Sequence, residues 1–199
     1  MNYGDLKKAI AGYLHRDDMS DQIVTAIQLA AARIGRDLRH RCNYVSTITT
    51  IQPIGIGGLP DRMREVQTVS AQAGTFDKTL QVVGIQQWAQ VQANGTGSPR
   101  VYCAEDGIVR VAPVSALTDV QISGWFQPAP LVNDTDSNSV LDYAPQLYVY
   151  GALMESFYWS QDGDLTSYAK QQYQNEIDLL NAETRSQNTG INPTMRRVR

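Results

Sequence analysis

The chain has 199 residues, of which 42% are hydrophobic and 19% charged, so it is long enough to bury one good core or two modest ones. A formal net charge of -3 excludes nucleic-acid binding by the bulk charge of the molecule. Cys42 and Cys103 stand far apart in sequence, which fits a reducing compartment better than a disulfide framework. The polar start "MNYGDLKKAI" and the lack of an apolar run of about 18–20 residues predict a soluble protein made in a cytoplasm.

The first forty residues predict two amphipathic helices. The first ends at "HRDD" and has its apolar side chains on one face: Tyr3, Leu6, Ile10, Tyr13 and Leu14. Ser20 is the predicted N-cap of the second. Its apolar stripe consists of Ile23, Ile27, Ala30, Ala31, Ile34 and Leu38. Because each stripe covers one face only, both helices need further apolar surface to pack against.

A β-rich region follows, from about residue 44 to residue 132. Its predicted strands are short, β-branched and separated by Gly and Pro: "YVSTITTI", "EVQTVSA", "KTLQVV", "PRVYCA", "GIVRVAP" and "DVQISGWF". Asp106 and Gly107 supply the residues of a tight hairpin turn within "RVYCAEDGIVRV". The segment "GIQQWAQVQANGTGSP" interrupts the strands and predicts a helical turn followed by a loop. We therefore expect a small β domain.

The segment "DYAPQLYVYGALMESFYWSQDGD", residues 142–164, predicts a helix with Pro145 in its first turn. Its large apolar side chains point in every direction: Leu147, Tyr148, Tyr150, Leu153, Met154, Phe157, Tyr158 and Trp159. Such a helix is either the centre of the protein or faces another subunit in part. The subunit-interface candidates are Tyr148, Tyr150, Phe157 and Tyr158.

A last helix is predicted after the turn "SQDGD". Its apolar face consists of Leu165, Tyr168, Ala169, Tyr173, Ile177 and Leu180. Helices at both ends with strands between them predict an α+β fold, in which an α-helical bundle carries an inserted small β domain and an extended C-terminal tail. The expected bounds are residues 1–43 and 141–185 for the bundle, 44–132 for the β domain, 133–140 for a linker and 186–199 for the tail.

Catalytic and metal-binding signatures are missing from the sequence. His15 and His40 have no zinc-ligand spacing, and no Gly-x-Ser-x-Gly elbow is present. The alternate spacing of Asp134, Asp136 and Asn138 matches the start of a calcium loop, but the glycine at the sixth loop position and the closing glutamate are absent. A solvated linker that caps the next helix is the favoured interpretation. We expect no enzyme activity and no cofactor.

The sequence "RIGRDLRHR" places Arg33, Arg36, Arg39 and Arg41 at the end of the second helix. One interpretation is that cations favour a helix C-terminus. The other is a basic ring, formed when several copies present the same helix end to DNA or to an acidic partner. Both remain open at the level of the sequence.

The C-terminal segment "TRSQNTGINPTMRRVR" has no apolar periodicity and predicts an extended tail. A disordered basic end is one interpretation. The other is a docking arm, because apolar and conformationally restricted residues accompany the arginines. The candidate docking residues are Ile191, Pro193, Met195, Arg196, Arg197, Val198 and Arg199.

Several of these segments together resemble the head-to-tail adaptor (connector) proteins of short-tailed bacteriophages, which dock beneath the portal after DNA packaging. The segments are "YGDLKKAIAGYLHRDD", "AAARIGRDLR", "LPDRMREV", "GSPRVYCAEDGIVRVAP" and "APQLYVYGALMESFYWSQDGD". They cover most of the chain in the order found in that family.

The resemblance implies a structural protein of the virion at the head-tail junction. It implies a ring of about twelve copies, with the helical part against the portal protein, a central channel for DNA passing without sequence-specific binding, and tail or nozzle proteins below. Each subunit of a ring has two different contact faces, so an unusually apolar helix can serve the bundle and a neighbour. No membrane contact is expected.

An alternative function is a monomeric or dimeric module that binds a small ligand or carbohydrate. Trp88, Trp125 and Phe126 of the β domain would form its apolar platform. The same residues are typical of an ordinary core, since aromatic side chains dominate burial in small domains.

Overall fold

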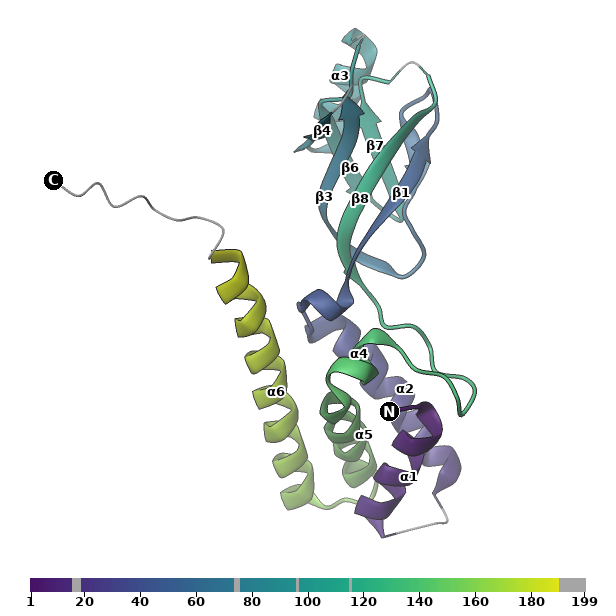
Figure 1. The fold of residues 1–199 in the computed structure, drawn as a ribbon, viewed down its shortest axis with the longest axis vertical. Helices are drawn as coiled ribbons and strands as arrows, with labels where there is room; N and C mark the ends of the chain where they lie inside the picture. Colours follow the sequence, from purple (N-terminus) through teal and green to yellow (C-terminus); the bar gives the residue numbers. More distant parts are fainter. Residues whose placement is uncertain (16–18, 74–75, 96, 115, 190–199) are drawn as a thin grey trace, which may run out of the picture. The chain divides into compact units, whose positions relative to one another are not determined.

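The computed structural model describes residues 1–15, 19–73, 76–95, 97–114 and 116–189. The chain forms two compact units, one of residues 1–43 and 127–199 and the other of residues 44–126. The first unit is helical and the second is built of strands with one helix, so the predicted α+β class is confirmed. Figure 1 shows the elements of each unit.

The helical unit contains α1 (Tyr3–Leu14), α2 (Ser20–Asp37), the short 3₁₀ helix η1 (Arg41–Asn43), α4 (Ser139–Tyr143), α5 (Pro145–Trp159) and α6 (Gly163–Thr189). Within this unit α5 lies between α2 and α6, and it also packs on α1 and α4 (Figure 1). Its apolar side chains therefore find partners on several sides, which explains why the helix has no polar face.

The close packing of α2 on α5 depends on Gly151. A Cβ atom at this position would lie 2.9 Å from the Cβ of Ala30, closer than two such atoms approach in proteins. Small residues at both positions let the two helices approach each other closely. Gly151 is buried in the middle of α5 and does not end the helix. The close packing that it allows outweighs its low helix propensity.

The predicted single helix over residues 142–164 is wrong in detail, because α4 and α5 are separate helices. Ala144 between them has φ -136° and ψ 68°, which is not helical. The residue before a proline is sterically excluded from the helical region, and Pro145 follows directly. Pro145 itself is at the first position of α5, where its missing N–H costs nothing.

Three other predictions about the helices need correction. Met19 is the N-cap residue of α2, so Ser20 begins the helix and does not cap it. The predicted faces of the first and last helices hold for most residues, but Tyr13, Leu165 and Tyr168 are exposed. Tyr13 is in the last turn of α1, and Leu165 and Tyr168 lie on a different side of α6 from the buried Ala169 and Tyr173. The last helix also continues to Thr189, so residues 186–189 are not extended.

The β unit consists of β1 (Tyr44–Ile51), β2 (Ile56–Gly58), β3 (Met63–Ala73), β4 (Phe76–Thr79), β5 (Gln81–Val82), α3 (Ile85–Asn94), β6 (Val101–Glu105), β7 (Ile108–Ala112) and β8 (Thr118–Phe126). In the described part of the chain the strands form two four-stranded sheets, with the orders β1-β8-β3-β4 and β2-β7-β6-β5. The bounds of β1 coincide with the predicted strand, and those of β8 differ from it by one residue.

The core of the β unit combines side chains from both sheets. Ile51, Val69, Ala71, Val120 and Ile122 come from the first sheet, and Tyr102, Val109 and Val111 from the second. Asp106 and Gly107 join β6 to β7 with φ values of 53° and 74°, the two positive values that a tight hairpin turn requires. The predicted hairpin is therefore confirmed.

Residues 127–132 belong to the helical unit, whereas the sequence assigned them to the β domain. Leu131 packs on the helical core, and the carbonyl of Ala129 accepts a hydrogen bond from Asn138. A Cβ atom on Gly35 of α2 would lie 3.2 Å from Gln127, so this segment runs tightly over α2. None of these contacts leaves a periodic pattern in the sequence, so the predicted end of the β domain lies six residues too late.

Candidate interaction surfaces

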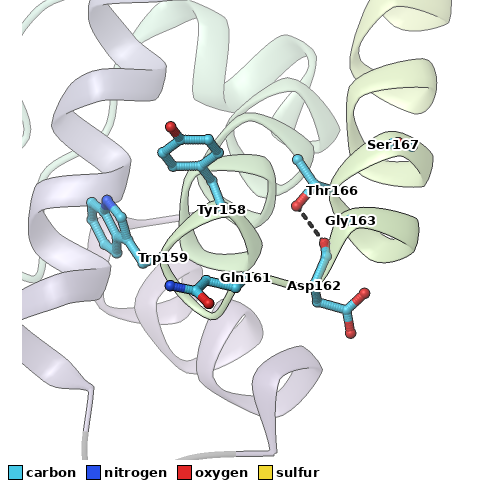
Figure 2. Close-up of a pocket in the computed structure, with 7 residues that line it drawn as sticks. All are labelled: Tyr158, Trp159, Gln161, Asp162, Gly163, Thr166 and Ser167. Atoms are coloured by element: carbon cyan, nitrogen blue, oxygen red, sulfur yellow. Dashed lines mark hydrogen bonds between the residues drawn. The ribbon is translucent and has the colours of Figure 1, made fainter.

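An open hollow of about 670 Å³ lies at the turn from α5 to α6. Figure 2 shows its lining, with Tyr158 and Trp159 at the end of α5 and Thr166 and Ser167 in the first turns of α6. The backbone N–H of Leu165 donates to Asp162 Oδ1 at 3.1 Å, so Asp162 caps α6. The hollow presents aromatic surface beside one carboxylate. The sequence predicted both the aromatic residues and the turn "SQDGD" that contains Asp162, but not the hollow that they form together.

The interface candidates on α5 differ in exposure. Tyr158 is 72% exposed and lines the hollow, whereas Tyr150 and Phe157 are half-buried against the helical core. Burial raises the pKa of Tyr150, and the neighbouring Tyr168, Tyr13 and Glu176 raise it further.

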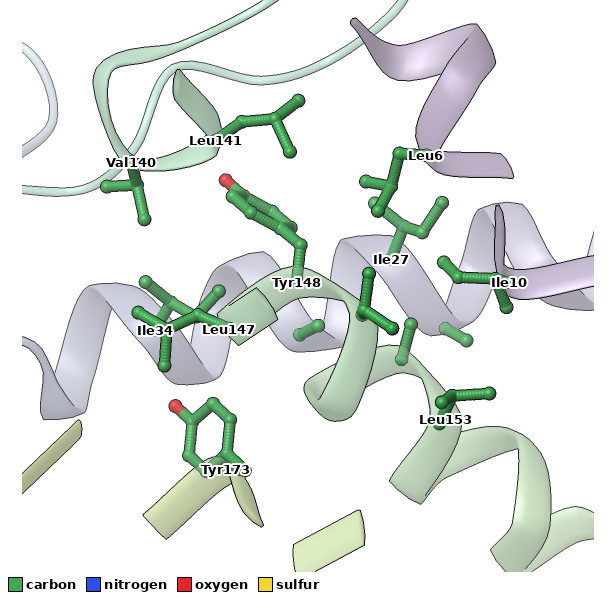
Figure 3. Close-up of a cluster of buried hydrophobic side chains, with 14 of the residues drawn as sticks. Leu6, Ile10, Ile27, Ile34, Val140, Leu141, Leu147, Tyr148, Leu153 and Tyr173 are labelled. Atoms are coloured by element: carbon green, nitrogen blue, oxygen red, sulfur yellow. The ribbon is translucent and has the colours of Figure 1, made fainter. Parts of the chain in front are cut away.

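Tyr148 belongs to the core of its own subunit. Figure 3 shows it among Val140, Leu141 and Leu147, and none of its surface is exposed. Asn138 Nδ2 donates a hydrogen bond of 2.9 Å to the Tyr148 hydroxyl oxygen. Tyr148 is therefore removed from the interface candidates, because a neighbouring subunit has no access to it.

Tyr148 should make stability depend on alkaline pH. Burial raises the pKa of its phenol to about 12, whereas a tyrosine in an unfolded chain ionises near pH 10. Between these values the unfolded chain loses a proton that the folded chain keeps. The free energy of unfolding should therefore fall as pH rises from about 10 to about 12, by about 3 kcal/mol for this group. Denaturant unfolding across this range should show a shallower fall for Tyr148→Phe, and equal slopes would contradict the assignment.

The four arginines of the predicted basic cluster lie around the C-terminal end of α2. Arg33 forms an ion pair of 2.5 Å with Glu155 of α5. Arg39 Nη1 donates to the carbonyls of Arg36 and Leu38, at 2.7 and 3.2 Å. These last bonds satisfy carbonyl groups that a helix end leaves without intrahelical partners, as the helix-terminus interpretation expects.

The remaining two arginines are more exposed. Arg36 occupies the last turn of α2 on the solvent side. The side chain of Arg41 is 62% exposed, and its Nη2 lies 3.9 Å from Glu183 Oε1. Arg36 and Arg41 therefore present more charge to solvent than Arg33. The partner of Arg33, Glu155, is 122 positions away and could not be predicted from the sequence.

Glu183 is the centre of a polar cluster that the sequence did not indicate. The Tyr143 hydroxyl donates to both of its carboxylate oxygens at 3.2 Å, and His40 Nε2 lies 3.5 Å from Oε2. His40 is buried and stacks on Tyr143 with 4.7 Å between ring centroids. Burial lowers the pKa of His40 and raises the pKa of the neighbouring Cys42 to about 11. Cys42 is therefore protonated at neutral pH and a poor nucleophile.

The linker acids are engaged within the helical unit. Lys7 donates to Asp134 at 2.5 Å, and Asp136 accepts from the backbone N–H groups of Val132 and Asn133. Asn138 accepts from the backbone N–H of Leu141, so it caps α4. Across the described ranges, no group of three or more His, Cys, Asp or Glu residues is placed to hold a metal ion.

The aromatic residues of the proposed ligand platform pack in different places. Trp88 of α3 packs on Val83, Val101 and Ala112, while Trp125 is buried edge-on against Tyr44 at 5.0 Å between centroids. A hollow of about 380 Å³ in the β unit is lined by other residues, among them Leu59, Met63 and Tyr102. The burial of Trp125 and the packing of the partly buried Trp88 therefore favour their interpretation as core.

The described chain is thus an α+β protein with exposed aromatic and charged surfaces. The SU10 adaptor protein family matches residues 1–197, and the chain belongs to this family. A comparison with curated proteins gives no significant match. The match agrees with the resemblance to phage head-to-tail adaptors, and family membership implies a structural adaptor of a phage particle that interacts with portal and tail proteins. Such adaptors are typically not enzymes.

None of the helices in the described ranges is long and apolar enough to cross a membrane. The predicted docking residues of the tail lie outside the described residues: Ile191, Pro193, Met195, Arg196, Arg197, Val198 and Arg199.

Proposed function

We propose that this chain assembles as a ring of about twelve copies beneath the portal, extends the DNA channel and provides the attachment site for tail components. The observation that carries the proposal is the match of the adaptor family to residues 1–197, nearly the whole chain. The ring, its stoichiometry and its position on the portal are the parts proposed here.

Exposed apolar side chains on the helical unit support a function through interfaces. They come from α1, α2, α5 and α6: Tyr13, Leu29, Tyr158, Trp159, Leu165, Tyr168 and Leu179. Single exposed apolar residues are normal, but many large ones on one small unit indicate surfaces that a partner covers. Tyr150, Phe157 and Tyr158 are the α5 residues that we assign to subunit contacts.

The C-terminal residues 190–199 are proposed to dock on the portal. The tail carries Arg196, Arg197 and Arg199 without an acidic residue, so the rest of the chain has a net charge of -3 - 3 = -6. Three apolar residues, Ile191, Met195 and Val198, alternate with polar ones. We infer that these apolar side chains enter pockets while the arginines meet acidic groups of the portal.

Arg36 and Arg41 are the arginines of the α2 cluster with the most exposed charge. Around a ring their charges would repeat in every copy, so the cluster is proposed to contact acidic groups of a neighbouring copy through Arg36, and an acidic partner or the DNA backbone in the channel through Arg41. Arg33 and Arg39 contribute less, since both already bind groups of their own subunit.

Sedimentation velocity with purified portal tests the function directly. Portal should sediment faster when the chain is added, and a tail component should bind the complex but not portal alone. Portal that sediments unchanged at a large excess of the chain would contradict the proposed function.

A further inference from the structure

The outer side of α6 carries an apolar stripe. Ala169, Tyr173, Ile177 and Leu180 bury one side of the helix in the core. A different side contains Leu165, Tyr168 and Leu179, which are 44%, 55% and 65% exposed. Gln172, Asn175 and Ala182 follow at spacings of three and four, so all six residues lie along the same side of the helix. We call these six residues the α6 stripe.

The exposed side of α2 has the same spacing. It consists of Gln22, Thr25, Leu29, Ala32 and Arg36, which we call the α2 stripe. Leu29 is 44% exposed, and Ala32 is exposed as well. Within the helical unit α2 and α6 lie on different sides of α5 (Figure 1). A single subunit therefore presents the two stripes on different flanks.

The two stripes lie at the same height in the helical unit. The side chain of Asn181 accepts from the Arg39 backbone N–H at 2.7 Å and donates to the Asp37 carbonyl at 3.1 Å, which sets Asn181 level with Leu38. Asn181 and Leu38 are 143 positions apart in the sequence. Leu165 and Gln22 are separated by the same number of residues, and so are Leu179 and Arg36. Because α2 and α6 run in the same direction, the stripes are in register along their length (Figure 1).

Opposite charges lie at one end of the two stripes. Asp178 flanks the α6 stripe beside Leu179. Arg33 and Arg36 lie at the end of the α2 stripe, and Arg36 and Asp178 are both exposed. At the shared register Arg36 stands level with Leu179, next to Asp178.

We propose that the α6 stripe of one copy packs against the α2 stripe of a second copy of this chain. The proposal rests on the proposed ring and names its subunit contact. In a cyclic ring a given residue has the same height along the ring axis in every copy. If the helices run along that axis, a contact between neighbouring copies therefore joins residues of equal height. In this arrangement the two stripes lie at equal height, and Asp178 of one copy faces Arg36 of the next.

Charge reversal and its repair test this contact in the full chain with portal. Arg36→Glu and Asp178→Arg should each raise the chain concentration needed to fill portal about tenfold, because like charges then face each other. The double variant restores opposite charges in every copy and should return that concentration close to the wild-type value. Lys170→Glu, an exposed reversal on α6 outside the stripe, is the matched control and should have no effect.

Leu179→Ser is the second variant. It removes apolar surface from the α6 stripe without changing the charge, and Leu179 is exposed in the subunit. It should also raise the chain concentration needed to fill portal, while leaving the melting temperature of the chain unchanged. Full rings formed by both single charge variants at wild-type concentrations, or no repair in the double variant, would overturn the inference. If the variants already lower the affinity of the first copy for portal, the stripes contact portal itself and the inference is wrong. A wild-type chain that never fills portal would instead contradict the proposed function.

Discussion

A chain that ends at Thr189 should fold normally but bind portal at least about tenfold more weakly than the full chain. The apolar core of the helical unit extends along α6 to Leu180, so removal of residues 190–199 takes away none of these packed side chains. Thermal melting should therefore stay nearly unchanged. Ordering a segment costs about 1–2 kcal/mol per residue, so charge alone is a weak anchor, and we expect the apolar tail residues to supply much of the affinity.

The arginines and the apolar residues of the tail can be tested separately by co-sedimentation with portal. Changing Arg196, Arg197 and Arg199 to Ala should weaken binding and make the remaining binding less sensitive to salt. Changing Ile191, Met195 and Val198 to Ser should weaken binding at every salt concentration. A truncated chain that binds as well as the full one at physiological salt would show that residues 190–199 do not dock.

Asn138→Ala should lower the free energy of unfolding by about 2–4 kcal/mol, the largest effect that we expect of a single polar substitution in this chain. The side chain accepts from the Leu141 N–H and donates to the Ala129 carbonyl and the Tyr148 hydroxyl. Alanine removes the cap of α4 and leaves the buried Tyr148 hydroxyl without this partner. Urea unfolding followed by circular dichroism measures the change.

Asn138→Ser is the matched control for this substitution. A serine hydroxyl can still cap α4 but does not reach the two groups to which the amide donates. The free energy of unfolding of Asn138→Ser should lie between those of wild type and Asn138→Ala. Equal stability of Asn138→Ala and wild type would mean that the three hydrogen bonds do not hold the linker on α4 and α5.

The sequence predicted the elements whose signals are local. The buried face of α2 follows helical periodicity, and its central residues Ile27, Ala30 and Ile34 are buried as expected. The strands β1 and β8 and the turn at Asp106 and Gly107 were found from β-branched runs and turn residues. In each case the residues that decide the structure are neighbours in the chain.

Features that depend on distant contacts were not predictable in this way. The ion pair of Arg33 with Glu155 and the contact of His40 with Glu183 join residues more than a hundred positions apart, and Tyr143 is 40 positions from Glu183. Periodicity alone also assigned Leu165 and Tyr168 to the core, although the packing partners of α6 begin at Ala169. Tyr148 was assigned to a subunit interface because an apolar helix does not reveal which of its sides the same chain covers.

The mass of the complex with portal, measured by light scattering, tests the central claim most directly. A ring at the head-tail junction predicts that saturated portal gains about twelve times the subunit mass of 22.0 kDa, without intermediate plateaus, and that a tail component then binds. A gain of only one or two subunits at saturation, or no gain at all, would contradict assembly of this chain as a ring beneath the portal.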